Sequence, residues 1–83
     1  MEVRAVPTIC RVGPYRFFFF ASDGDEPQHV HVERDMAHAK FWLDPVRLDR
    51  SSGFRSHEIN RIHEIVEENR EHLIRSWNEY FGN

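Results

Sequence analysis

The chain has 83 residues, which is enough for one small domain and leaves no room for a second core. Its formal net charge of -3 argues against bulk, nonspecific binding of nucleic acid, so RNA is a partner that the charge does not support. Cys10 is the only cysteine, which excludes a disulfide framework and a cysteine zinc site, and we expect it in the core.

The chain start and the apolar runs predict a cytoplasmic protein without a membrane segment. Residues 1–4 carry charges and lack the apolar run of a signal peptide. The longest strongly apolar run, residues 17–21, is far shorter than the ~20 residues that span a bilayer.

The first predicted elements are two β-strands joined as a hairpin. After a lead-in over residues 1–7, the segments 8–12 and 15–22 are β-rich, and a Gly-Pro pair at 13–14 separates them. The register that follows pairs Val12 with Tyr15, Arg11 with Arg16 and Cys10 with Phe17.

Phenylalanines occupy both faces of the second strand. Phe17 and Phe19 point to one side, and Phe18 and Phe20 point to the other. A strand that is apolar on both faces is usually covered twice. In so small a domain, another copy of the chain could cover the second face of this strand, so a homodimer is one expectation.

Residues 22–27 have the composition of a loop, being acidic and marked by glycine and proline. The run Asp23-Gly24-Asp25 resembles part of a calcium-binding loop, but the rest of that pattern is missing. We therefore expect a plain loop exposed to solvent.

Residues 29–33 alternate strictly between valine and polar side chains, which indicates a half-buried strand. A turn near residues 34–37 and a further strand at about 38–43 set Glu33 opposite His38, His31 opposite Lys40 and His29 opposite Trp42. One face then collects His29, His31, Glu33, His38, Lys40 and Trp42. The other face collects Val30, Val32, Ala39, Phe41 and Leu43. A slip of one residue would mix the two sets, so the pattern supports this register.

The last third of the chain predicts helix. Residues 46–48 form either a short edge strand or a helical turn, and residues 50–55 form a loop. Ser56 is the expected N-cap of a helical segment over residues 56–81, in which apolar side chains follow one stripe. An unbroken helix would be about 39 Å long, whereas a domain of this size is about 30 Å across. The helix therefore either breaks near Asn69 or extends beyond the domain and packs against a second molecule.

These elements predict a single α+β domain over residues 1–83. An antiparallel sheet of about four strands (hairpin, loop, hairpin) occupies residues 8–48. A long or broken helix at 56–81 covers the valine face of that sheet.

The polar face could hold a metal ion. His29 and His31 are two residues apart on one strand face, ~6.5–7 Å, which two imidazoles gripping one ion can span. Glu33 or His38 could be the third ligand. The alternative is a polar sheet face whose histidines hydrogen-bond with their neighbours.

The same face could also act without a metal. His29 or His31 would serve as general acid or base near neutral pH, while Lys40 and Arg16 hold an anion such as phosphate. That combination suits metal-independent RNA cleavage. Arg16 takes part only if the second strand neighbours the third, which the sequence does not show.

Segments spread along the chain form a specific combination. They are Pro7-Thr8-Ile9, Tyr15-Arg16-Phe17-Phe18-Phe19, Glu26-Pro27, His29-Val30-His31-Val32, Ala39-Lys40-Phe41-Trp42-Leu43 and Trp77-Asn78-Glu79-Tyr80-Phe81. This combination resembles the small bacterial domain-of-unknown-function family 4160. Two departures from that family are Gln28, where a second proline is usual, and residues 34–37, where the family turn is often glycine-rich.

The resemblance implies a component of a two-gene, toxin–antitoxin-like module that pairs with another small protein. It brings no established catalytic residues, and its characteristic positions here are Arg16, His29, His31 and Lys40. The leading prediction is a protein-interaction component, without a cofactor, that binds through this His/Lys/Arg face. The alternatives are a nuclease-type enzyme that uses the same four residues and a metal-binding module through His29, His31 and Glu33.

Overall fold

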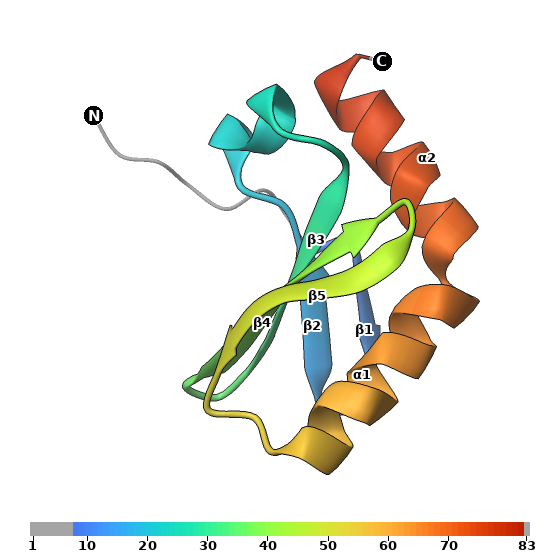
Figure 1. The fold of residues 1–83 in the computed structure, drawn as a ribbon. Helices are drawn as coiled ribbons and strands as arrows, with labels where there is room; N and C mark the ends of the chain where they lie inside the picture. Colours follow the sequence, from blue (N-terminus) through green and yellow to red (C-terminus); the bar gives the residue numbers. More distant parts are fainter. Residues whose placement is uncertain (1–7, 83) are drawn as a thin grey trace.

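The computed structural model describes residues 8–82, and the predicted lead-in at residues 1–7 lies outside them. Five antiparallel strands form one sheet in the order β1-β2-β3-β4-β5, and two helices follow (Figure 1). The strands are β1 (Cys10–Val12), β2 (Tyr15–Phe18), β3 (His29–Arg34), β4 (Ala37–Leu43) and β5 (Val46–Ser52). The two helices that follow the strands are α1 (Ser56–Glu68) and α2 (Arg70–Phe81), and a 3-10 helix, η1 (Ala21–Asp25), lies between β2 and β3. The predicted α+β class is confirmed, with five strands in place of about four.

The first hairpin has the predicted register, with all three expected pairs between β1 and β2. Gly13 lies in its turn with a φ of 55°, a conformation that favours glycine. Cys10 is half-buried and packs against the core, and burial raises the pKa of its thiol. β2 ends at Phe18, before the predicted end at residue 22, because the chain bends into η1.

The pairing of β3 with β4 has the predicted register and separates the two faces as expected. The apolar face is completely buried and forms the centre of the core with Val30, Val32, Ala39, Phe41 and Leu43. The helices add Ile62, Ile65, Val66, Leu73 and Trp77 to the same cluster. Figure 1 shows α1 and α2 along one side of the sheet, with η1 near the C-terminal end of α2.

β5 is longer than predicted, and the expectation of a loop beginning at residue 50 is wrong. Residues 46–52 pair along β4 as an edge strand. Six of these seven residues are exposed, so the strand shows no alternation of apolar and polar side chains. A bulge interrupts the register between Lys40 and Phe41 of β4, and it leaves Asp49 without a partner on that strand.

The helical segment breaks at Asn69, which was one of the two predicted alternatives. The Asn69 side-chain Nδ2 donates a hydrogen bond to the Ile65 carbonyl at 2.8 Å, and its backbone has a ψ of 11°. A side-chain amide that bonds to the main chain in this way competes with regular helix geometry. α1 begins at Ser56 with Arg55 as N-cap and no side-chain capping bond, so the predicted Ser56 cap is wrong.

The second side of β2 is covered from within the chain. Phe18 is only 5% exposed, and its ring centre lies 5.2 Å from that of Phe20 and 5.5 Å from that of His31. The Arg16 guanidinium lies 4.3 Å from the centre of the Phe18 ring. The burial of Phe18 therefore needs no second copy of the chain, and a homodimer stays a prediction.

A carboxylate on α1 ties this helix to the sheet. Glu58 accepts hydrogen bonds from Arg34 Nε and Nη2 at 2.9 and 2.8 Å and from the Tyr15 hydroxyl at 3.1 Å. The hydrogen bond from Arg34 is the main reason that the pKa of Glu58 is lowered. A lowered folded-state pKa stabilises the fold above the unfolded-state pKa, and this stabilisation disappears as the pH falls through the folded-state pKa.

We expect the free energy of unfolding to decrease as the pH falls below about 5, and Glu58→Gln to remove part of that decrease. Urea unfolding at several pH values between about 7 and 3 measures the effect. Glu64→Gln, which changes an exposed glutamate of the same helix, is the control. The same pH dependence in all three proteins would contradict the role of Glu58.

Candidate metal centre

The polar face of the sheet carries all four residues that the sequence singled out. Because β2 neighbours β3, Arg16 lies opposite Glu33 and shares the face of His29, His31 and Lys40. The sequence alone could not show this adjacency. The four side chains nevertheless have different hydrogen-bond and ion-pair partners, and these partners determine which chemistry each side chain can perform.

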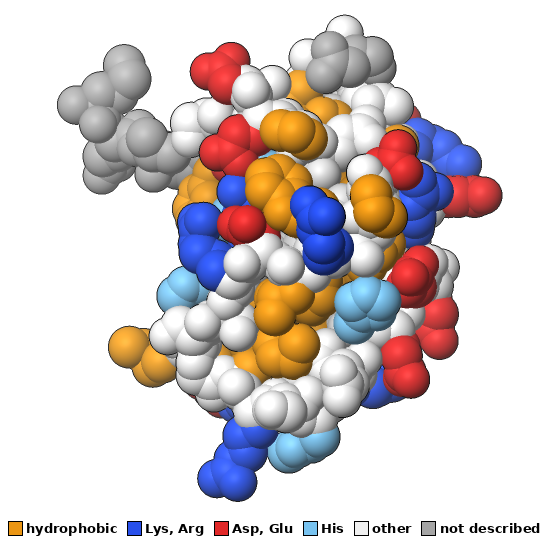
Figure 2. Space-filling view, in the orientation of Figure 1, with side chains coloured by type: hydrophobic (Ala, Val, Ile, Leu, Met, Phe, Trp, Pro, Cys, Tyr) orange, Lys and Arg blue, Asp and Glu red, His pale blue; other side chains and the backbone are white. Residues whose placement is uncertain are grey.

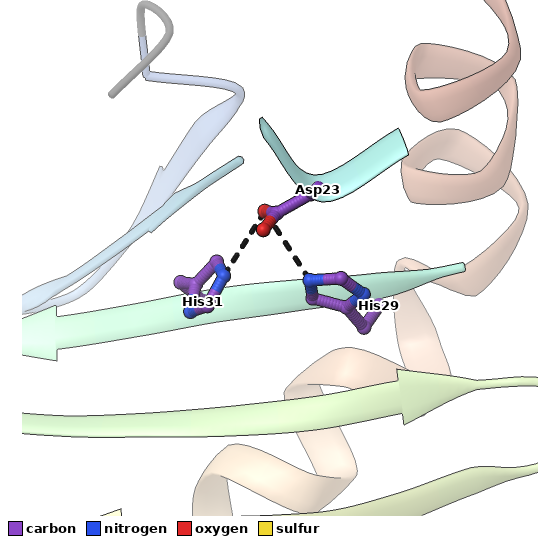
Figure 3. Close-up of side chains that lie close together, drawn as sticks. All are labelled: Asp23, His29 and His31. Atoms are coloured by element: carbon purple, nitrogen blue, oxygen red, sulfur yellow. Dashed lines mark hydrogen bonds and ion pairs between the residues drawn. The ribbon is translucent and has the colours of Figure 1, made fainter. Parts of the chain in front are cut away.

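η1 covers the histidine end of this face and contributes a carboxylate to it. Asp23 is only 8% exposed, although its loop was expected to be solvated. Its Oδ2 accepts a hydrogen bond from the Phe20 N–H at 2.8 Å, and its own N–H donates to the Phe20 carbonyl at 3.0 Å. This tight turn directs the carboxylate inward, toward β3 (Figure 3).

Asp23 lies between the two histidines of β3. Its Oδ2 is 3.2 Å from Nε2 of His29 and 3.0 Å from Nε2 of His31 (Figure 3). The alternation of β3 puts both imidazoles on one face, and η1 brings the carboxylate over them. All three residues are buried, and one ligand atom from each lies within 4.8 Å of the others.

One hydrogen bond of His29 indicates which ring nitrogen carries the proton. Nδ1 lies 2.8 Å from the Pro27 carbonyl oxygen, which can only accept, so the hydrogen is on Nδ1. In this tautomer Nε2 presents a lone pair, and this atom is buried without a hydrogen-bond partner. A lone pair that faces the Asp23 carboxylate at 3.2 Å is unfavourable. A cation between the two atoms would remove the conflict.

His31 donates a hydrogen bond from Nε2 to Asp23 Oδ2 at 3.0 Å, because a carboxylate oxygen can only accept, and a bound ion would take the place of this proton. Burial lowers the pKa of His31, and the opposing effect of the Asp23 charge is smaller. The ring is therefore neutral at pH 7, as a metal ligand must be. Phe18 and Phe20 pack against it, with ring centres 5.5 and 4.7 Å away.

The distances from Asp23 to the two histidines match those between ligands of a metal site. Zinc binds imidazole nitrogen at about 2.0–2.1 Å and carboxylate oxygen at about 2.0–2.2 Å, so neighbouring donors on one ion lie about 2.9–3.4 Å apart. The separations of 3.0 and 3.2 Å around Asp23 fall in this range. The Pro27 carbonyl on Nδ1 of His29 is the kind of outer hydrogen bond that orients a ligating histidine.

Lys40 is engaged with carboxylates beside this cluster. Its Nζ lies 2.6 Å from Glu26 Oε1, 3.7 Å from Asp49 Oδ2 and 4.5 Å from the centre of the Trp42 ring. The hydrogen bond from Lys40 is the main reason that the pKa of Glu26 is lowered. Asp49 belongs to the irregular part of β5, where a bulge redirects side chains.

Arg16 and Glu33 form a pair of their own. Arg16 Nη1 lies 3.0 Å from Glu33 Oε2, and its Nε donates to the Thr8 hydroxyl at 2.6 Å. The cluster of ligand atoms thus contains Asp23 in the place where the sequence predicted Glu33 or His38.

The sequence did not predict which acidic residues belong to the site. Asp23 and Glu26 lie in the segment expected to be solvated, and Asp49 lies on a strand whose length was underestimated. A signal was present, because an acidic segment stands directly before a strand with two histidines. Composition does not distinguish a loop that faces water from one that folds onto a sheet.

Gly24 lets η1 approach the end of α2. A Cβ at this position would lie 2.8 Å from Cδ1 of Phe81, closer than carbon atoms normally approach. We expect Gly24→Ala to displace η1 and lower the free energy of unfolding by about 1–3 kcal/mol, as measured by urea unfolding.

The double variant with Phe81→Leu tests whether this contact is the cause. The smaller side chain should recover much of the loss, which appears as a coupling between the two positions. If Gly24→Ala is equally harmful in both backgrounds, the contact with Phe81 is not responsible.

Comparison with known proteins identifies a family. No curated protein and no solved structure matches the chain. No helix within residues 8–82 is long and apolar enough to cross a membrane. One protein family matches residues 15–78, which include Asp23, His29 and His31, and it is the family that the sequence segments resemble. The chain therefore belongs to the family described as domain of unknown function (DUF4160).

Proposed function

We propose that the chain is a metal-binding domain in which Asp23, His29 and His31 hold one divalent transition-metal ion, with zinc as the first choice. The observation that carries the proposal is the buried Nε2 of His29, which has no hydrogen-bond partner and faces Asp23 Oδ2 at 3.2 Å. A buried polar atom without a partner costs about 1–3 kcal/mol. A bound ion would replace that cost with a bond.

An ion would satisfy the lone pair of His29 Nε2 and the carboxylate of Asp23 together, and it would replace the hydrogen bond between His31 Nε2 and Asp23 Oδ2. The aromatic rings of Phe18, Phe20, Trp42 and Trp77 pack against the two histidines and make the surroundings of the centre apolar.

The donor set selects the class of ion. Imidazole suits zinc, iron, copper and nickel, whereas calcium and magnesium prefer oxygen ligands. Two histidines and one carboxylate occur at catalytic zinc sites and at iron(II) sites, so Fe²⁺ is the main competitor of Zn²⁺.

The test is a zinc titration of metal-free protein from which any purification tag has been removed. We expect about one equivalent to bind with a Kd below about 1 μM, which corresponds to about 8 kcal/mol. Elemental analysis of the protein as purified then identifies the ion that it carries from the cell. Glu33→Gln, which changes the predicted ligand that instead pairs with Arg16, should leave the affinity unchanged. Absence of stoichiometric binding by any transition-metal ion would contradict the proposal.

The nuclease-type alternative has less support from the geometry. Lys40 and Arg16 already pair with carboxylates, and His29 is completely buried, so the four residues do not present an open acid/base site. On the face drawn in Figure 2, basic and acidic side chains are interspersed. A broad basic stripe, which nucleic-acid backbones favour, does not stand out there.

We also propose, from the family resemblance, that the chain is a bacterial cytoplasmic protein that binds another small protein, as in a two-gene, toxin–antitoxin-like module. The supporting observation is Met36, which is 94% exposed at the turn between β3 and β4. Methionine is common at adaptable binding surfaces. Met36→Glu should prevent co-purification with the product of the adjacent gene and leave zinc binding intact. Unchanged co-purification would oppose this contact.

A further inference from the structure

On the basis of the proposed metal site, we infer that the ion keeps an open coordination position and that this position takes a small anionic oxygen ligand carrying a planar apolar ring. Within residues 8–82, the cluster of ligand atoms contains Asp23, His29 and His31 and no fourth histidine, cysteine or carboxylate. Structural zinc sites use four protein ligands, whereas sites that act on substrates use three and leave a position for water or substrate. The donor count therefore indicates an exchangeable site.

The charge at the centre favours an anion in that position. A divalent ion with one carboxylate and two neutral imidazoles has a formal charge of about +1. The nearby Glu26 carboxylate does not offset it, because Lys40 lies 2.6 Å away and neutralises Glu26. Aromatic rings surround the histidines, and in such poorly hydrated surroundings an unbalanced charge is strongly unfavourable. A monoanionic oxygen ligand would bring the centre to neutrality.

A groove beside His31 suits a planar group attached to such a ligand. Its lining includes Phe18, Phe20, His31, Ala37, His38 and Arg50. His31 is the member of the ligand set that lines this groove. Phe18 and Phe20 offer aromatic surfaces against which a ring can pack.

The charged residues of the groove do not oppose an anion. Its acidic side chains, Glu33 and Asp35, each pair with an arginine at 3.0 and 3.2 Å. Arg50 lies at the rim of the groove with a side chain that is 64% exposed, and its Nη1 lies 3.3 Å from Asp49 Oδ2. Exposed ion pairs are weak, so an anionic ligand can compete with Asp49 for this guanidinium. The ligand class is therefore an aryl carboxylate, hydroxamate or similar oxyanion.

The experiment uses the full chain loaded with Co²⁺ in place of Zn²⁺, because the visible spectrum of cobalt reports changes in its coordination. Benzohydroxamate and acetohydroxamate are the probes, since both offer the same anionic oxygen donors and only one carries a ring. We expect both to change the spectrum and benzohydroxamate to bind at least about tenfold more tightly. Phe20→Ala should reduce this preference to less than about threefold. Tyr80→Ala, which changes an exposed tyrosine outside the groove, should retain it.

The outcomes separate this inference from the proposed function. Failure to bind Co²⁺ would overturn the metal site itself. Binding of Co²⁺ with a spectrum that neither probe changes would leave the metal site standing and overturn the open position. Equal affinities for the two probes would overturn recognition by the groove. If Phe20→Ala loses the metal, Arg50→Gln provides the second measurement, with an expected loss of at least about threefold in affinity for both probes.

Discussion

Replacing His29 with asparagine is expected to lower the affinity for zinc by more than about 100-fold while the fold is retained, since even outer-shell partners are worth about 10–100-fold. The asparagine amide nitrogen can occupy the position of Nδ1 and still donate to the Pro27 carbonyl. The variant lacks Nε2, which is the atom proposed to bind the ion. Zinc titration against a competing chelator measures the affinity, and thermal unfolding checks the fold.

His38→Asn is the matched control for this variant. His38 lies on the same face of the sheet, is exposed and does not belong to the ligand cluster. In addition, zinc at about 100 times its Kd should stabilise the wild-type protein and His38→Asn by about 2.7 kcal/mol, and should not stabilise His29→Asn. Equal zinc affinity in His29→Asn and the wild type would remove the basis of the proposed site.

Replacing Trp77 with alanine is expected to lower the free energy of unfolding by about 3–5 kcal/mol. Trp77 is 1% exposed, and its ring centre lies 4.3 Å from that of Phe81, 5.3 Å from that of Phe19 and 5.1 Å from that of His29. Domains are stable by only about 5–15 kcal/mol, so the loss is a large fraction of the total. Urea unfolding measures it.

Tyr80→Ala provides the comparison for Trp77→Ala within the same helix. Tyr80 is 49% exposed, and substitutions at such positions usually change stability by less than about 0.5 kcal/mol. Because Trp77 packs against His29, Trp77→Ala should also weaken zinc binding, whereas Tyr80→Ala should not. Similar losses of stability in both variants would mean that Trp77 does not anchor the core.

The parts of the fold that could be predicted from the sequence are those with a periodic apolar pattern. The valines of β3 alternate with polar residues, so the register with β4 followed from the need to keep one face apolar. The length of a continuous helix left two alternatives, a break near Asn69 or an extension beyond the domain, and the structure has the break. β5 has no such pattern, because it is an exposed edge strand held by main-chain pairing to β4.

The candidate site was predictable only in the part that lies on regular strands. His29 and His31 share a face because their strand has a period of two, and this holds wherever the chain goes next. Asp23 joins them because η1 folds back over the sheet, which depends on a local turn with Phe20 and on packing of Gly24 against Phe81. The contact of Gly24 with Phe81 joins parts of the chain that no local pattern connects.

The order of the strands has a consequence for how the protein forms during translation. Each strand pairs with its neighbours in the chain, so every pairing closes a short segment, and topologies rich in such local contacts fold quickly. The residues of the proposed metal centre, 23–31, are synthesised before α1 and α2. The apolar face of the sheet is covered only when Trp77, near the end of α2, has been synthesised, and Gly24 of η1 packs against Phe81, which comes later still. The proposed ligand set and the core are therefore completed together, after the strands have paired.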